Sequence, residues 1–157
     1  MKTFFTFVCG MLAIAVMSWF LLTYVLLTDV QRVDRTIEKA RRCVENGSII
    51  SLANLFAADY HHENGLGREE ILGALKELFQ QTSDIRVRLI STSTKVDGPL
   101  AQSTVRFLFA AKSINNYPYV QSLLADASQE SKEIHVTLVK QGRSWQIQRT
   151  AINVVNN

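Results

Sequence analysis

The sequence predicts an α+β protein, in which an N-terminal transmembrane helix precedes three helices packed on a curved antiparallel sheet of about four strands. Two observations support this prediction. Residues 4–27 contain no charged side chain, and after Thr82 the apolar residues change from a helical to a strand-like spacing. Helices followed by a run of strands favour a sheet with its helices on one face.

The composition is that of one globular domain behind an apolar segment. The 157 residues include 17 Lys and Arg against 14 Asp and Glu, a net charge of +3, with 47% hydrophobic residues, 7 Gly and 2 Pro. These values exclude disordered, collagen-like and low-complexity chains. Because every acidic residue lies at or beyond Asp29, we divide the chain into a transmembrane anchor, residues 1–28, and a domain, residues 29–157.

The apolar segment has the length of a membrane span. At about 1.5 Å per residue, a helix over residues 4–27 slightly exceeds a bilayer core of about 30 Å. A cleaved signal peptide is the alternative, since Ala13-Ile14-Ala15 has the spacing of a cleavage site. Cleavage there would leave a second apolar stretch, from Trp19 to Leu27, at the new N-terminus. We therefore predict an uncleaved single-pass anchor in the cell (inner) membrane.

Two features of the sequence give opposite predictions for the side of the membrane on which the domain lies. Five basic residues follow the span and only Lys2 precedes it, which by the positive-inside rule keeps the domain cytoplasmic. The basic residues after the span are Arg32, Arg35, Lys39, Arg41 and Arg42, and an anionic lipid surface would attract them. The short Met-Lys start, in contrast, resembles a bacterial signal-anchor, and on that basis we favour the extracytoplasmic side.

Three helices are expected in the first half of the domain. Val30, Val33, Ile37, Ala40 and Val44 recur at helical spacing. Asn46-Gly47 ends this helix, and a short second helix runs from Ser48 through Phe56. A polar loop, residues 59–65, then leads to a third helix that opens at Gly67-Arg68-Glu69-Glu70 and buries Ile71, Leu75, Leu78 and Phe79.

Four strands are expected in the second half. The first two form an antiparallel pair joined at Asp97-Gly98-Pro99, and the last two are joined at Gln141-Gly142-Arg143. Residues 120–127 between the pairs are a possible short helix. The predicted inward positions are apolar and indicate a filled core: Ile85, Val87, Leu89, Val105, Phe107, Phe109, Ile134, Val136, Leu138, Trp145 and Ile147.

This layout resembles the nuclear transport factor 2-like superfamily, also called cystatin-like α+β cones. The resemblance covers roughly residues 30–155 and rests on element order and four phrases of sequence: Glu45-Asn46-Gly47-Ser48, residues 55–60, residues 67–71 and residues 142–147. It implies a cone closed by a curved sheet, and dimerisation through that sheet. It does not imply one activity, because this scaffold carries both enzymes and plain binding modules.

The candidate pocket residues are Asp59, Tyr60, His61 and Arg149. Arg149 shares strand parity with Trp145 and Ile147, so we expect it to point into the cone unless a bulge turns it out. Asp59 or Glu63 could then pair with it. Asp59, His61, His62 and Glu63 could also ligate a metal, but their spacing fits a tetrahedral site poorly, and we predict no metal and no cofactor.

No catalytic residue is predicted, because the inward strand positions carry no carboxylate and the chain contains no nucleophile motif. The low net charge also argues against nucleic acid as a partner. The sequence predicts a membrane-anchored, non-catalytic binding or assembly module, a possible homodimer with an unknown protein partner or small ligand. The alternative is a small-molecule-binding or isomerase/cyclase-like enzyme, which needs a cone pocket of about 300 Å³ or more with convergent polar groups.

Overall fold

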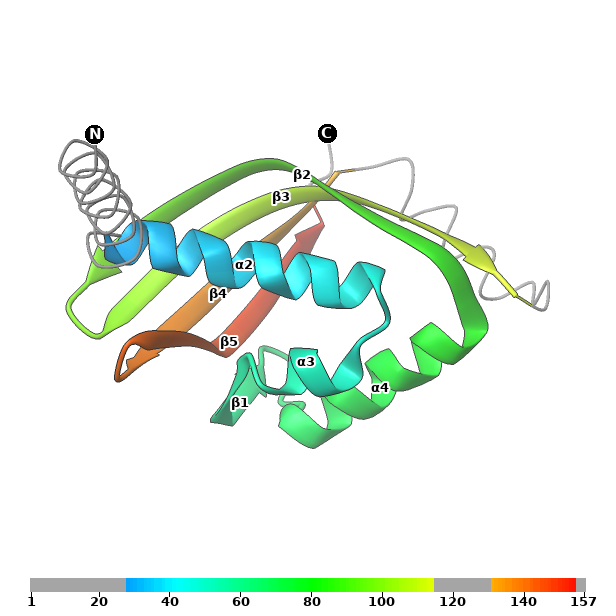
Figure 1. Cartoon of the computed structure of the whole chain (residues 1–157), viewed down its shortest axis with the longest axis horizontal. Coiled ribbons are helices and arrows are strands. Elements are labelled where there is room, and N and C mark those ends of the chain that lie inside the picture. The colour runs from blue at the N-terminus through cyan, green and yellow to red at the C-terminus, as the bar shows by residue number, and fades with distance from the viewer. Residues whose placement is uncertain (1–27, 115–130, 155–157) are drawn as a thin grey trace, which may run out of the picture.

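The computed structural model describes residues 28–114 and 131–154. Its elements are α2 (Asp29–Glu45), α3 (Ile49–Ala53), β1 (Phe56–His62), α4 (Arg68–Gln81), β2 (Thr82–Asp97), β3 (Leu100–Ser113), β4 (Lys132–Gln141) and β5 (Ser144–Val154). Figure 1 shows the helices gathered on one side of a curved sheet. The prediction of an α+β fold with helices packed on a curved, largely antiparallel sheet is confirmed.

Two predicted helices lie outside the described residues: the transmembrane helix at 4–27 and the short helix at 120–127. Within 28–114 and 131–154, no helix is long and apolar enough to cross a bilayer.

The sheet has five strands, in the order β1-β5-β4-β3-β2, so the prediction of about four was one short. The additional strand is β1, which pairs in parallel with β5 and takes up residues assigned to the second helix and the polar loop. The second helix accordingly ends at Ala53. Phe56, Ala57 and Tyr60 are buried, whereas Asp59 between them is exposed. The sequence prediction therefore took an edge strand with one solvent-exposed face for a loop.

Helix α2 starts with its own N-cap. Thr28 is extended (φ −61°, ψ 152°), its hydroxyl accepts a hydrogen bond from the Gln31 backbone N–H (3.4 Å), and the Gln31 side chain accepts from the Thr28 N–H (3.2 Å). This capping box marks a break in helical backbone at residue 28. The predicted apolar stripe is buried from Val33 onward, since Val33 and Ile37 are buried and Ala40 and Val44 pack against the core. Val30, the first residue of the predicted stripe, is exposed instead.

Helix α2 also covers one edge of the sheet, strand β2. The backbone N–H of Val87 donates to Glu45 Oε1 (2.8 Å), and the Val87 carbonyl accepts from Arg41 (3.3 Å). Arg41 and Glu45 pair with each other at 2.5 Å. Two side chains of α2 therefore make the backbone hydrogen bonds of Val87 that a neighbouring strand would otherwise make.

Candidate functional site

The helices and the sheet line a partly open apolar cavity of about 280 Å³. Its wall comes from α2, α3, α4 and all five strands, and Arg41 and Thr150 are the only polar or charged residues among the described residues that line it. The apolar residues that line it are Ile37, Ala40, Val44, Leu52, Phe56, Leu75, Val87, Leu89, Val105, Phe107, Phe109, Ile134, Val136 and Ile147. Among the described residues, this cavity has no carboxylate and no histidine in its wall.

The expectation of a filled core holds for only part of the sheet. Val105, Val136, Leu138, Trp145 and Ile147 are buried as predicted. Five other predicted core residues line the cavity and are only half-buried: Val87, Leu89, Phe107, Phe109 and Ile134. The sheet curves away from the helices there, so the aromatic side chains line the cone without plugging it.

The guanidinium of Arg41 is paired with two carboxylates of the same helix. Its guanidinium donates to both carboxylate oxygens of Glu38 (2.8 Å each) as well as to Glu45. The hydrogen bonds that Arg41 donates to Glu38 raise the pKa of Arg41 further above its ordinary value, and the nearby charge of Glu45 adds to this. The aliphatic part of the Arg41 side chain therefore lines the cavity, while its guanidinium stays bound to Glu38 and Glu45 of α2.

The second polar group of the wall is a buried pair of hydroxyls. Tyr60 is 4% exposed, and its hydroxyl lies 2.5 Å from the Thr150 hydroxyl, which belongs to the cavity wall. Burial raises the pKa of Tyr60, and the hydrogen bond with Thr150 partly opposes this rise. The Tyr60 ring packs on Phe56, with ring centroids 4.5 Å apart. Tyr60 therefore lies directly behind the wall of the cone.

Arg149 does not point into the cone. In the ladder between β4 and β5, Thr137 pairs with Arg149 but Leu138 pairs with Ile147, so Gln148 is an extra residue on β5. This β-bulge reverses the parity after Ile147, which buries Thr150 and leaves Arg149 exposed on the outer face. The inward orientation expected from strand parity was wrong.

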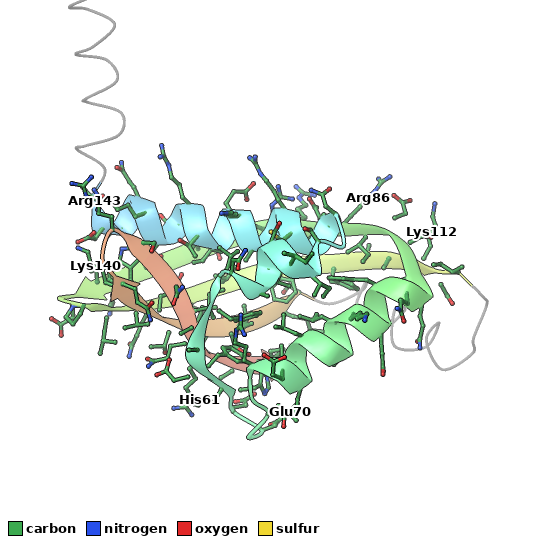
Figure 2. The ribbon with its side chains drawn as sticks, turned by 60° about the horizontal axis from the view of Figure 1, so that its bottom comes forward. His61, Glu70, Arg86, Lys112, Lys140 and Arg143 are labelled. Carbon is green, nitrogen blue, oxygen red and sulfur yellow. The ribbon has the colours of Figure 1, made fainter. Side chains whose placement is uncertain are left out.

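The structure divides the four candidate residues between the two faces of the sheet. His61 is the β1 partner of Arg149, and both are exposed. Asp59 is exposed too and accepts a hydrogen bond from Gln148 (2.6 Å). Figure 2 shows His61 projecting away from the helices. Asp59, His61 and Arg149 thus lie near one another outside the cone, and only Tyr60 lies beside the cavity.

Metal ligands do not gather in the described part of the chain. Within 28–114 and 131–154, no three His, Cys, Asp or Glu side chains are placed to hold one ion. His135 lies on the outer face, where it contacts Glu133 (3.3 Å) and Thr104 (3.1 Å).

A second depression, of about 380 Å³, lies between α2 and the turn that joins β4 to β5. Arg32, Arg35 and Lys39 of α2 and Arg143 of the turn contribute its four charged side chains. From the sequence, Arg143 was a candidate for a basic patch with Lys140 and the sheet arginines Arg86, Arg88 and Arg106, and not for a group with the α2 cations. The 3- and 4-residue spacing of Arg32, Arg35 and Lys39 places them on one helix face, whereas no local pattern indicates that the turn lies beside them.

The ion pairs of Glu38 predict a loss of stability in acid. Hydrogen bonds from Arg41, with a further contribution from Arg42, lower the pKa of Glu38 from 4.5 to about 2. A carboxyl group whose pKa is lower in the folded state stabilises the fold above its unfolded pKa, and this stabilisation is lost as the pH falls through the folded value. We expect the melting temperature to fall from about pH 5 towards pH 2, and Glu38→Gln to weaken this dependence.

Thermal unfolding of the full chain, followed by circular dichroism across this pH range, measures the effect. Glu77→Gln is the matched control, because Glu77 is exposed on α4 and has no ion pair with a described residue. Equal pH dependence in Glu38→Gln and Glu77→Gln would contradict the role of Glu38.

Solved structures of other proteins share the fold of this chain. No family model matches the sequence, and no curated protein matches it. An NTF2-like protein from Cytophaga hutchinsonii superposes with a TM-score of 0.65 at 10% identity, covering 82% of this chain and 100% of that one. A protein of the NTF2-like family from Streptomyces avermitilis, whose name suggests a dehydratase, gives 0.65 at 16% identity, with 82% and 97% covered.

A protein from Novosphingobium aromaticivorans, whose name suggests an aromatic ring hydroxylase, also gives a TM-score of 0.65, at 13% identity, with 82% and 90% covered. Identities this low establish a common architecture and leave activity open. Helices packed on a curved five-stranded sheet, together with these superpositions, show that the chain has the nuclear transport factor 2-like, cystatin-like fold.

Proposed function

We propose that this protein is a membrane-tethered, non-catalytic binding module whose cone holds an apolar ligand. The observation that carries the proposal is the apolar wall of the 280 Å³ cavity. Arg41 is the one ionisable side chain among the described residues of this wall, and it is already bound to Glu38 and Glu45. Contact between such an apolar wall and an apolar ligand removes apolar surface from water, which favours binding. The cavity falls just short of the volume expected for a ligand pocket and lacks the convergent polar groups.

The enzyme alternative has less support from the cone. General acid–base catalysis needs a titratable group within hydrogen-bond reach of the substrate, and the described cavity wall offers none that is free. Tyr60 is the nearest candidate, but its hydroxyl is occupied by Thr150. The enzyme names of two similar structures support an isomerase-, cyclase- or dehydratase-like role only through the shared fold.

The membrane tether rests on the uncharged run at residues 4–27. The cell (inner) membrane as the location, and the extracytoplasmic side for the domain, stay predictions. A homodimer formed through the sheet, and an unknown protein partner, stay predictions.

Native mass spectrometry of the full chain, purified from cells in a neutral detergent, tests ligand binding. We expect the wild-type chain to retain an added non-protein mass. In Ala40→Leu, three further carbon atoms project from α2 into the cavity. Displacing about two methylene groups of ligand costs roughly 1.5 kcal/mol, so the affinity should fall about tenfold and less added mass should be retained.

Ala74→Leu is the matched control, because it adds the same atoms to an exposed position of another helix, α4. It should retain as much added mass as the wild type. The proposal fails if no chain retains an added mass, or if Ala40→Leu retains as much as Ala74→Leu.

A further inference from the structure

A basic groove lies on α2, outside the cone. Its charges come from Arg32, Arg35 and Lys39 of α2 and Arg143 of the β4–β5 turn, and none of the described residues that line it is acidic. We propose that this basic groove binds the phosphate headgroup of an anionic membrane lipid. The inference rests on the membrane tether of the proposed function, and is independent of what the cone holds.

An ion pair holds the two halves of the basic groove together. Lys140 of β4 contacts Asp29, the first residue of α2, at 2.8 Å, and Asp29 also pairs with Arg32 at 3.8 Å. These contacts fix the β4–β5 turn against the start of the helix. Figure 2 shows Lys140 and Arg143 together beside that end of α2. Arg143 thereby joins a row of cations more than a hundred residues earlier in the chain.

Three of the four cations have no counter-ion within the described structure. Arg35, Lys39 and Arg143 are exposed and make no hydrogen bond or ion pair with a described residue. Other arginines are neutralised by comparison, since Arg41 and Arg42 both bind Glu38. The concentration of unpaired positive charge is therefore a property of the basic groove and not of α2 as a whole.

The shape and chemistry of the basic groove suit a phosphate group. Buried Trp145 and Leu55 are among its lining residues. The hydroxyl groups of Thr36 and Ser144 also line it but donate to backbone carbonyls, so the cations are the groups that would bind a phosphate. Guanidinium groups bind phosphate oxygens through two parallel hydrogen bonds, and a lysine adds a point charge. A depression of about 380 Å³ accommodates one headgroup, in contrast to the extended basic track that a nucleic acid requires.

The position of the basic groove in the chain favours a lipid as the source of the phosphate. The uncharged run ends at Leu27, and Arg32 follows five residues later. Five residues reach at most about 18 Å, so a tethered domain holds this end of α2 close to the headgroup layer. Cations near an anionic leaflet strengthen membrane binding, and the effect fades within a Debye length.

Titration of the full chain in neutral detergent with short-chain phosphatidylglycerol, followed by native mass spectrometry, tests this assignment. Phosphatidylcholine and inorganic phosphate are titrated in parallel. We expect phosphatidylglycerol to bind in preference to both. Each cation contributes about fivefold to affinity, so Arg35→Gln combined with Arg143→Gln should weaken phosphatidylglycerol binding about 25-fold.

The control combines Lys76→Gln with Arg88→Gln, which removes the same charge from two exposed residues without ion pairs to described residues. It should bind within about twofold of the wild type. Equal losses in the two double variants, no preference over phosphatidylcholine, or equally tight binding of inorganic phosphate would each overturn the lipid assignment. Ala40→Leu should leave this titration unchanged, which separates the basic groove from the cone. Release of the chain from membranes by alkaline carbonate would contradict the tether alone.

Discussion

Leu138→Ala is expected to lower the free energy of unfolding by about 3 kcal/mol, in the range found for truncating buried leucines. Leu138 is 0% exposed on the inner face of β4, within the main core cluster. Removing its side chain leaves a hole that rigid neighbours cannot fill. Urea unfolding of the full chain in neutral detergent, followed by circular dichroism, measures the loss.

Leu89→Ala is the informative comparison, because it makes the same chemical change in the wall of the cavity. Leu89 is half-buried and already lacks neighbours on its cavity side, so its truncation forfeits fewer contacts. We expect a loss of about 1 kcal/mol. A loss at Leu89 as large as that at Leu138 would mean that the cone is packed solid, contrary to the structure.

Glu45→Ala is expected to lower the free energy of unfolding by about 2 kcal/mol, because a hydrogen bond to a charged group contributes about 1.5–3 kcal/mol. Glu45 Oε1 is the partner of the Val87 N–H at 2.8 Å, and its other oxygen pairs with Arg41. The variant leaves an edge-strand N–H without its partner and frees Arg41 from one of its two anions. Urea unfolding measures this effect as well.

Two further variants are compared with Glu45→Ala. Glu45→Gln keeps an oxygen that can accept from the Val87 N–H, and should recover about half of the loss. Glu77→Ala removes an exposed carboxylate that makes no ion pair with a described residue, and should change stability by less than about 0.5 kcal/mol. If Glu45→Ala is no more destabilising than Glu77→Ala, the side-chain bridge from α2 to β2 does not stabilise the sheet edge.

The features that could be predicted from the sequence are those encoded locally. The stripe of Val33, Ile37, Ala40 and Val44 predicted α2, and Gly98 and Gly142, both with positive φ, mark the two hairpin turns. The acidic first turn of α4 is present as well, with Glu70 accepting from the Gly67 N–H at 2.5 Å. Periodicity and capping residues specify such elements within a few residues of chain.

The features that could not be predicted depend on distant partners. Strand β1 is stabilised by pairing with β5, nearly ninety residues later, and its outward Asp59 and His61 make it look like a loop. The bulge at Gln148 has no local signature, yet it decides that Arg149 faces outward. One inserted residue reverses every later side chain on a strand, so counting parity misplaced this residue.

Photolabelling of the full chain with a short aliphatic diazirine tests the central claim, which is that the cone is the binding site, most directly. We expect adducts on cavity residues such as Val105, Phe107 and Ile134, reduced about tenfold in Ala40→Leu and unchanged in Ala74→Leu. Adducts confined to exposed apolar residues outside the cone, such as Ile90, Leu100 and Ile152, or equal labelling of the cavity in Ala40→Leu and the wild type, would contradict the account.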